Sequence, residues 1–240
     1  MCASTRASVP TAGRLITFEG PEGSGKTTQV RMLHAYLVEA GYPVLLVREP
    51  GGTKISEQIR DVLHDVANVE MMPNAEVLLY SASRAQLVGQ VIVPALQAGQ
   101  VVLCDRFAES TLAYQGYGHC LNLDLLRAIT SFATGGLRPD MIVYLDIEAE
   151  EGLRRKEEAH RNSNAEWNRM DQKPLEFHQR VREGYLELAN AEPRRWFMTN
   201  ARLSPDEVQR AIRAQVDQFL SSKKMPENSM STPRKERPER

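Results

Sequence analysis

The feature that most constrains the fold is the segment at residues 20–27, GPEGSGKT, which matches the pattern G-x-x-x-x-G-K-[ST] at every fixed position. An apolar run at residues 15–18 precedes it, and a stretch typical of a helix, at about residues 25–40, follows it. Glycines let the backbone wrap around phosphate oxygens and point N–H groups at them from the start of a helix. The segment therefore predicts a strand, a phosphate-binding loop and a helix, and with them a bound nucleoside triphosphate.

Two side chains of this loop are suited to the chemistry of a triphosphate. Lys26 can reach the β- and γ-phosphates with its positive charge, and the Thr27 hydroxyl can bind Mg²⁺. A glycine-rich turn without a ligand is the alternative, but the flanking strand and helix disfavour it. The expected ATP-binding residues are Gly20, Pro21, Glu22, Gly23, Ser24, Gly25, Lys26, Thr27 and Thr28.

Short apolar runs alternate with amphipathic stretches along residues 14–220. The runs lie at residues 15–18, 44–47, 101–104, 141–145 and 196–198. The expected helices lie at residues 25–40, 56–65, 74–98 with a break or bend at Pro94, 121–133, 174–191 and 205–220. Apolar strands separated by helices are typical of a parallel sheet covered on both faces. We therefore predict an α/β, P-loop NTPase or nucleotide kinase fold with a five-stranded parallel sheet flanked by helices in three layers; the strand order stays open.

Composition narrows the kind of protein but not its activity. A net charge of −1 gives no reason to expect a nucleic acid or a membrane as partner, and no apolar run approaches the roughly 20 residues of a membrane span. Residues 1–13 lack the apolar core of a signal peptide, so a cytoplasmic protein is expected. We expect residues 1–13 and the polar, basic residues 221–240 to be disordered on either side of one domain at residues 14–220.

The three cysteines, Cys2, Cys104 and Cys120, are too few and too scattered for a disulfide framework or a zinc site. Cys104 ends an apolar run, where a small core residue is the favoured interpretation. A reducing compartment fits this usage.

Other classes of P-loop protein lack support in the sequence. We find no D-x-x-G segment and no N-K-x-D segment of a GTPase, and the run at residues 101–104 ends in Asp105 and Arg106 rather than in paired acidic residues. An aspartate there can orient Mg²⁺ and the arginine can bind a phosphate, although a surface ion pair is the simpler interpretation of that pair alone. A kinase is favoured, with a P-loop ATPase of the switch type as the alternative from another class.

Further segments occur in a specific order. They are REPGGT at residues 48–53, RAQ at 84–86, DRF at 105–107 and STLAYQG at 110–116. Together with the phosphate-binding loop they make the chain resemble the thymidylate kinase family from about residue 14 to residue 220. The resemblance implies ATP-dependent phosphorylation of dTMP to dTDP on the route to dTTP, with Mg²⁺, in a cytoplasmic homodimer. A UMP/CMP or AMP kinase would share the loop but not the REPGG and AYQG segments.

The resemblance also implies roles for residues at the acceptor site. Tyr80, where relatives carry Phe, would stack on thymine, and Arg84 would donate to the carbonyl edge of the base. Without the family, Val77, Tyr80, Arg84 and Val88 would be interpreted as the core-facing stripe of a helix. The dTMP-binding residues implied by the resemblance are Glu22, Arg48, Pro50, Tyr80, Arg84, Arg106, Thr111, Tyr114 and Gln115.

Several of these roles are specific. Pro50 would hold its loop beneath the nucleotide, and the family suggests a cis peptide there. Glu22 would accept a hydrogen bond from the sugar 3′-hydroxyl, and Tyr114 would crowd the 2′ position and so favour deoxyribose. Thr111 and Gln115 would complete the polar rim around the base. A polar residue on the surface is the simpler interpretation of each.

The charged stretch at about residues 154–171 is either a solvated loop or a lid that closes over ATP. The phosphate-binding loop carries no arginine and so resembles the class whose lid supplies one, for which Arg155 and Arg169 are the candidates. The catalytic residues implied are Lys26, Arg106, Arg155 and Arg169, and the magnesium ligands implied are Thr27 and Asp105.

Overall fold

The structure, a computed structural model, describes residues 12–163 and 166–222. Its core is a five-stranded parallel sheet with the order β2(Val44–Arg48), β3(Val101–Asp105), β1(Arg14–Glu19), β4(Met141–Asp146) and β5(Trp196–Asn200). The prediction of five parallel strands is confirmed, and the strand order is new information. β1 lies at the centre, so the loop that follows it meets the ends of both neighbouring strands.

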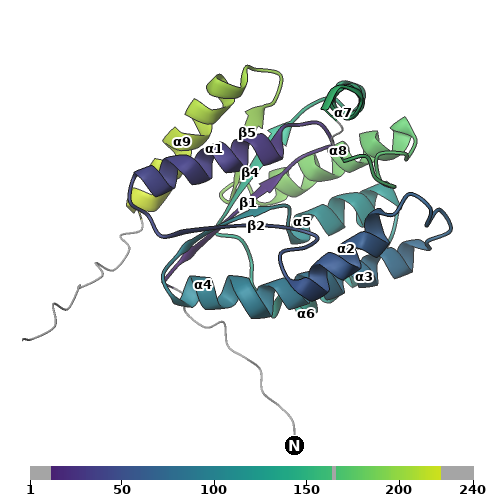
Figure 1. Ribbon diagram of the computed structural model, residues 1–240, viewed down its shortest axis with the longest axis horizontal. Helices are drawn as coiled ribbons and strands as arrows, with labels where there is room; N and C mark the ends of the chain where they lie inside the picture. Colours follow the sequence, from purple (N-terminus) through teal and green to yellow (C-terminus); the bar gives the residue numbers. More distant parts are fainter. Residues whose placement is uncertain (1–11, 164–165, 223–240) are drawn as a thin grey trace, which may run out of the picture.

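Helices cover both faces of the sheet (Figure 1). They are α1(Lys26–Glu39), α2(Lys54–His64), α3(Pro73–Leu87), α4(Val93–Gln97), α5(Ala108–Thr111), α6(Leu123–Thr134), α7(Ala149–Ser163), α8(Leu175–Ala191) and α9(Pro205–Ser222), with π-helical turns η1(Val88–Ile92) and η2(Leu112–Gly118). Ile16 and Phe18 of β1 pack with α1 and α9, whereas Leu15 packs with α3, η1 and α4. This alternation produces the three layers.

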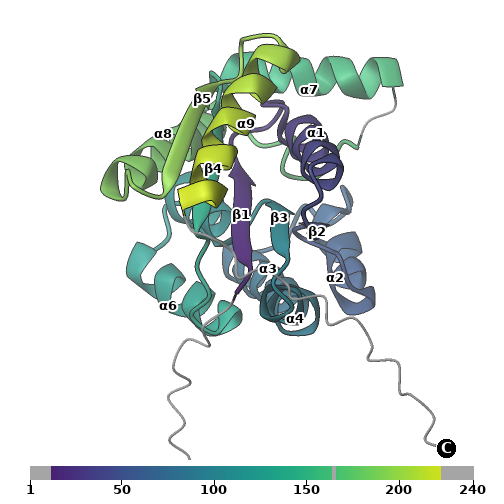
Figure 2. The same cartoon turned by 90° about the vertical axis from the view of Figure 1, so that its left-hand side faces the viewer.

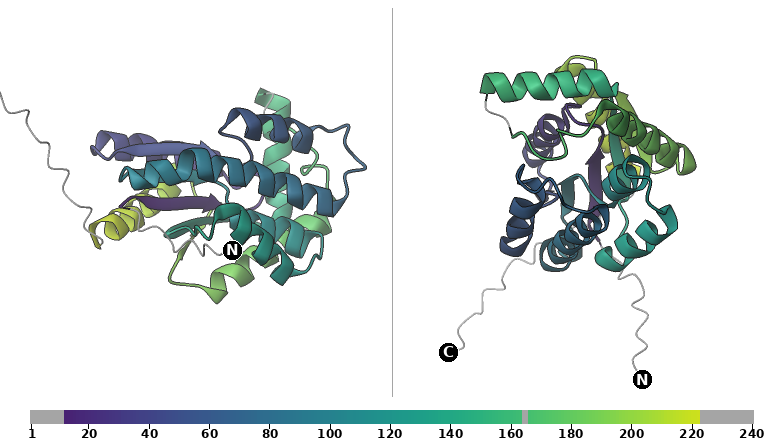
Figure 3. Two further views of the ribbon diagram at one scale, coloured as in Figure 1. Left: turned by 90° about the horizontal axis from the view of Figure 1, so that it is seen from below. Right: turned by 90° about the vertical axis from the view of Figure 1, so that its right-hand side faces the viewer.

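The layers leave the carboxyl ends of the strands open for a site. Figure 2 shows α7 lying across the end toward which β1 points. Figure 3 shows α3 and α4 running lengthwise along the strands and α7 crossing the same end of the molecule. In open parallel sheets, ligands bind outside the carboxyl ends of the strands. Among the described residues, no helix combines the length and the apolar character that crossing a membrane requires.

Three helical segments differ from the sequence-based expectation. The break expected at Pro94 lies one turn earlier, in η1, where the Val93 N–H donates to the Val88 carbonyl; the wider turn accommodates a proline that has no N–H to donate. Residues 149–163 form α7, although only 154–163 were expected, as part of a charged stretch, and residues 112–118 form η2. Neither showed a helical apolar pattern, because α7 is solvated on most of its surface and η2 is not α-helical.

The expectations for the cysteines and the tails have different outcomes. Cys104, in β3, is fully buried in the apolar cluster between the sheet and α3, η1 and α4, which confirms its interpretation as a core residue. The domain begins with β1 at Arg14 and α9 ends at Ser222. The expectations for residues 1–11 and 223–240, and for Cys2, lie outside the described residues.

Candidate active site

A cavity of about 630 Å³ opens at the carboxyl ends of β1, β2 and β3. Most of the residues predicted from the sequence line it together, although they come from six separate segments. They are Glu22, Gly23, Gly25, Lys26, Thr27, Thr28, Arg48, Pro50, Tyr80, Arg84, Asp105, Arg106, Thr111, Tyr114, Gln115 and Arg155. Four others do not line it: Gly20, Pro21, Ser24 and Arg169.

The phosphate-binding loop wraps around the Lys26 ammonium group. Its Nζ donates to the carbonyls of Gly20 at 2.9 Å and Pro21 at 2.8 Å, and to the Ser24 hydroxyl at 3.3 Å. Burial, followed by the charge of Arg106, lowers the Lys26 pKa to about 8, although Glu22 and other carboxylates oppose the shift. Gly20, Pro21 and Ser24 thus hold the lysine from behind rather than line the cavity.

The loop also touches the start of α7 without any side chain between them. A Cβ atom on Gly23 would lie 1.9 Å from the Gly152 carbonyl oxygen, and one on Gly152 would lie 2.2 Å from the Glu22 carbonyl oxygen. Gly23 also has a φ of 66°, which other residues rarely adopt. Only glycine at both positions permits this backbone contact between loop and helix.

Thr27 and Asp105 form an oxygen-rich corner beside the lysine. The Thr27 hydroxyl donates to Asp105 Oδ2 at 2.6 Å. Mg²⁺ binds oxygen ligands, takes only one or two from the protein and keeps waters or phosphate oxygens for the rest. A hydroxyl and a carboxylate in contact therefore fit a magnesium ion carried by a triphosphate, whereas the described residues contain no preformed group of three His, Cys, Asp or Glu side chains.

Arg106 connects the phosphate-binding loop to Tyr114. Its φ is 73°, a conformation that is rare outside glycine, and its N–H donates to the Phe18 carbonyl at 3.0 Å. The guanidinium donates to Glu22 Oε1 at 2.7 Å and lies 5.0 Å from the centre of the Tyr114 ring. Tyr114 donates to the same Glu22 oxygen at 2.8 Å. Strained backbone of this kind is found at functional sites more often than elsewhere.

Glu22 is a carboxylate held ionised by its surroundings. Burial alone would raise its pKa, but the charges of Arg106, Lys26 and Lys156 outweigh it and hold the pKa well below the usual range. The carboxylate is thus the anionic partner of Arg106 in the structure.

Arg84 is enclosed at the other end of the cavity, with 2% of its surface exposed. Its Nε donates to Glu49 at 2.7 Å, and its terminal nitrogens donate to Thr111 Oγ1 at 2.9 Å and to the Phe107 carbonyl at 3.0 Å. Burial raises the Glu49 pKa to about 7, against the lowering effect of Arg84. Arg84 is therefore fixed in one position by three residues, Glu49, Phe107 and Thr111.

The REPGG loop lies against this buried pair. The Glu49–Pro50 bond is cis, as the resemblance suggested, and Pro50 lines the cavity. Arg48 reaches only the rim: it donates to the Pro50 carbonyl at 2.7 Å and forms an exposed ion pair with Glu57 at 2.8 Å. Tyr80 lines the cavity one helical turn before Arg84 and is partly exposed.

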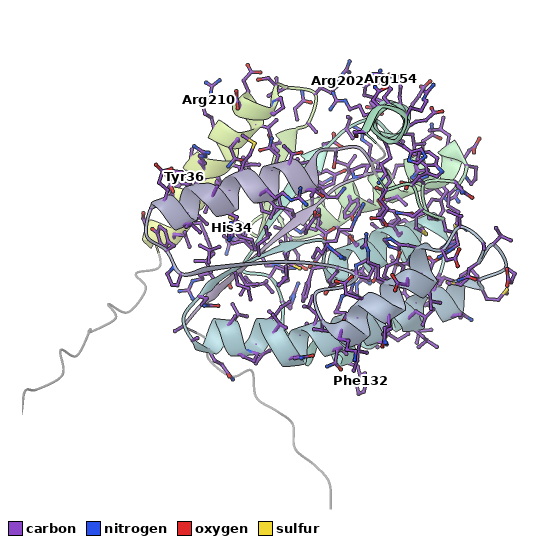
Figure 4. The ribbon with its side chains drawn as sticks, viewed as in Figure 1. His34, Tyr36, Phe132, Arg154, Arg202 and Arg210 are labelled. Carbon is purple, nitrogen blue, oxygen red and sulfur yellow. The ribbon has the colours of Figure 1, made fainter. Side chains whose placement is uncertain are left out.

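The two candidate lid arginines occupy different places. Arg155 lines the cavity from α7, and it donates to the Ala201 carbonyl at 2.8 Å and to Glu151 at 2.9 Å. Its neighbour Arg154 lies at the outer edge of the molecule (Figure 4). Arg169 is 4% exposed and donates to Glu76 and to the Leu63 carbonyl, so its guanidinium is enclosed behind the cavity wall. The structure thus brings Arg155, and not Arg169, to the cavity.

Comparison with known proteins agrees with this geometry. The model of the family described as thymidylate kinase matches residues 18–212. The thymidylate kinase of Roseiflexus sp. is 53% identical over 214 residues, covering 86% of this chain and 95% of that protein. The thymidylate kinase of Deinococcus radiodurans is 50% identical over 206 residues, covering 86% and 97%.

The chain belongs to the thymidylate kinase family.

A solved thymidylate kinase also resembles the chain in structure. The enzyme from Ehrlichia chaffeensis superposes with a TM-score of 0.68 at 30% identity, covering 85% of this chain and 98% of that one. Membership confirms the predicted kinase activity, ATP-dependent phosphorylation of dTMP to dTDP, and excludes the switch-type ATPase. It also confirms the P-loop kinase fold.

The motifs of the thymidylate kinase family did not identify every residue that lines the cavity. Glu166 bonds to both Arg60 and His64 and so joins the lid segment to α2. Lys156, next to Arg155, also faces the cavity. These residues lie in charged stretches without a recognisable spacing, so only their position in the fold reveals them. Glu49 and Glu76, the carboxylates behind Arg84 and Gln115, were likewise missed; their place next to predicted residues was the available signal.

Proposed function

We propose that this single cavity carries out the transfer with ATP at the phosphate-binding loop and dTMP at the Arg84 end. The observation that carries the proposal is the position of Arg106, which contacts Gly20 and Glu22 of the phosphate-binding loop on one side and Tyr114 on the other. The γ-phosphate of ATP and the phosphate of dTMP would meet there, because both are anions and Arg106 can donate to both at once.

On the donor side, residues 20–28 bind the triphosphate through their backbone N–H groups, and Lys26 turns from the loop carbonyls toward the β- and γ-phosphates. Thr27 and Asp105 would hold Mg²⁺, which would neutralise phosphate charge when bound. Arg155 adds a positive charge from α7. Arg169 is assigned a supporting place and not a catalytic one, because Glu76 and Leu63 occupy its guanidinium.

On the acceptor side, Tyr80 stacks on thymine, Arg84 donates to a base carbonyl, and Thr111 and Gln115 complete the rim. Pro50 and the rim residue Arg48 support the loop beneath the nucleotide. Binding of the dTMP phosphate replaces Glu22 as the anion that Arg106 contacts, which frees Glu22 to accept from the 3′-hydroxyl. Tyr114, held by Glu22, stands against the 2′ position.

Transfer of the phosphate group requires correct positioning and positive charge rather than a general base. An oxygen of the acceptor phosphate is already anionic near neutral pH, so no side chain has to remove a proton from the nucleophile. Lys26, Arg106 and Arg155 neutralise charge that develops on the transferred group, held in line between donor and acceptor. Closure of residues 154–171 excludes water and suppresses hydrolysis of ATP.

We also propose a homodimer that works in the cytoplasm. Large apolar side chains stand exposed on the helical layer opposite α1 and α9: Phe132 is 90% exposed and Leu125 60% on α6, and Leu78 is 61% exposed on the neighbouring α3. Phe132 projects from the edge of the molecule in Figure 4. A second copy of the chain would cover such side chains. Sedimentation equilibrium tests this proposal: Phe132→Ser should shift the protein toward the monomer.

The first test of the function measures ADP formed from Mg-ATP with dTMP, dUMP, UMP, CMP, AMP or GMP added separately. A rate that rises sharply with dTMP and weakly with dUMP supports both the reaction and the base pocket. A larger rise with another monophosphate would overturn the roles of Tyr80, Arg84 and Tyr114. Omitting Mg²⁺ should abolish the reaction, and a rate that does not depend on Mg²⁺ would remove Thr27 and Asp105 from their proposed role.

A further inference from the structure

We propose that Glu76 is a positioning residue that sets which end of the Gln115 amide faces the base, and thereby selects bases that carry a hydrogen at N3. The inference rests on the proposed function, in which Gln115 lies at the rim of the base pocket. It adds to that function a buried carboxylate that touches no substrate and yet determines specificity.

Glu76 lies on the same face of α3 as the two residues proposed to bind the base. Tyr80 and Arg84 follow at spacings of four, so the three side chains lie one above another along the helix. Glu76 itself has no exposed surface and does not line the cavity. Its contacts with the site pass through Gln115, whose Nε2 donates to Glu76 Oε1 at 2.6 Å.

The chemistry of this contact fixes the orientation of the amide. An ionised carboxylate only accepts hydrogen bonds, so the Gln115 NH₂ group must face Glu76. The carbonyl oxygen Oε1 must then be the end directed away from Glu76, and among the described residues no group donates to it. Gln115, 2% exposed, therefore offers the cavity a hydrogen-bond acceptor in a fixed position.

Glu76 is held ionised by groups around it. Burial alone would raise its pKa, but the nearby His119 ring, the charge of Arg169 and the bond from Gln115 together lower the pKa to about 2. The His119 ring nitrogen Nε2 lies 3.3 Å from Oε1, and Arg169 donates to the other oxygen. Arg169, predicted from the sequence to be catalytic, thus keeps the charge on Glu76.

A fixed acceptor distinguishes the pyrimidines. Thymine and uracil carry an N–H at position 3 between two carbonyls, whereas cytosine has a bare nitrogen acceptor there and an amino group at position 4. Arg84 only donates, so it matches a carbonyl and not an amino group. Arg84 and Gln115 Oε1 together match the donor and acceptor pattern of thymine. If the amide turned over, Gln115 would present N–H groups to the N3 hydrogen and the match would be lost.

The test is Glu76→Gln, which keeps the size of the side chain but can donate to Gln115 and so permits the flipped amide. Turnover is measured with dTMP and with the monophosphate of 5-methyldeoxycytidine. The KM for dTMP should rise about tenfold or more with kcat little changed, and the kcat/KM preference for dTMP over the cytosine analogue should fall at least about tenfold. Glu109→Gln is the matched control, because it removes another buried carboxylate that lies outside the cavity.

A merely structural role would lower kcat/KM for both substrates alike, so an unchanged preference in a folded Glu76→Gln enzyme would overturn the proposal. The double variant Glu76→Gln, Gln115→Glu restores a donor facing an acceptor and should recover much of the preference. Arg169→Lys, which keeps the charge beside Glu76, should retain the preference better than Arg169→Met.

Should Glu76→Gln fail to fold, the unmodified enzyme provides the test. N3-methyl-dTMP lacks the hydrogen that Gln115 is proposed to accept and should be turned over at least about tenfold less efficiently than dTMP. Equal turnover of the two would overturn the inference while leaving the dTMP kinase activity intact. Absence of activity with dTMP itself would instead overturn the proposed function.

Discussion

The two ends of the cavity are built differently. At the acceptor end, Arg84, Glu49, Gln115 and Glu76 are each 6% exposed or less and bonded to one another or to the backbone. At the donor end, Arg155 pairs with Glu151 on the surface of α7, and Gly25, Thr27 and Thr28 are exposed. The acceptor end is held together by buried hydrogen bonds and an ion pair, whereas part of the donor end is open to solvent.

This difference separates two kinds of contribution. Buried pairs such as Arg84–Glu49 belong to the stability of the fold, because removing one partner leaves the other as an unpaired buried charge. Solvent-exposed pairs on α7, such as Arg154–Glu158, contribute little to stability. We therefore expect changes at the donor end to lower turnover, and changes at the acceptor end to lower stability and affinity for dTMP.

The strongest test of the donor end is Lys26→Ala. Loss of the charge on the β- and γ-phosphates should lower kcat by about a thousandfold or more. The free energy of unfolding should change by less than about 1 kcal/mol, since burial already disfavours the cation and lowers its pKa to about 8. Steady-state kinetics and urea denaturation measure the two quantities, with Lys54→Ala, outside the cavity, as control. Near-normal turnover would remove Lys26 from catalysis.

At the acceptor end, Arg84→Met should lower the free energy of unfolding by about 3 kcal/mol, because the buried Glu49 carboxylate loses the cation with which it is paired. The Glu49 pKa in the folded protein is already about 7 and should rise further without Arg84. At pH values above the pKa of the unfolded chain, Glu49 must then take up a proton on folding, which costs free energy that grows with pH. The loss should therefore grow as the pH rises above about 7.

Denaturation of Arg84→Met at several pH values measures this loss. Arg84→Met combined with Glu49→Gln should recover part of the stability and remove the pH dependence. A small loss of stability that does not depend on pH would contradict the expectation that the buried Arg84–Glu49 pair contributes to the stability of the fold.

Arg155→Ala separates the two ends most directly, because Arg154 provides a matched control on the same helix. Arg155 faces the cavity, and its loss should lower kcat by about a hundredfold. Arg154 pairs with the same Glu151 but lies on the outer side, so Arg154→Ala should leave kcat within about twofold. Neither should change stability by more than about 0.5 kcal/mol. Equal effects of the two variants on kcat would mean that α7 acts through its general charge.

The smallest effect concerns pH. Because the Lys26 pKa lies near 8, kcat/KM for ATP should fall about tenfold per unit above that pH, as the free enzyme loses the ammonium proton. The profile of kcat should decline only at higher pH, since bound phosphates stabilise the charged form. A kcat/KM profile that stays level to about pH 9.5 would mean that the lysine remains charged in the free enzyme.

The sequence predicted the phosphate-binding loop and the acceptor-side segments better than it predicted the lid. REPGG, RAQ and AYQG lie in ordered segments of fixed spacing, so Arg84, Pro50 and Gln115 were found and line the cavity. The lid has no such spacing. α7 shows a charged surface without an apolar stripe, and the sequence of the charged stretch contains no pattern that distinguishes Arg155 from Arg169. Only the fold places Arg169 behind Glu76, because that contact joins residues 93 positions apart. Strand order was unpredictable for the same reason, as it depends on long-range packing.

The backbone contact between Gly23 and Gly152 bears on how the enzyme could escape an inhibitor. A substitution alters the surface on which an inhibitor rests by adding or changing a side chain there. Neither glycine can acquire one, because the new Cβ atom would lie about 2 Å from a peptide oxygen of the other segment. A compound seated against these two peptide groups would therefore touch a surface that a single substitution at either position cannot alter without displacing the loop that binds ATP.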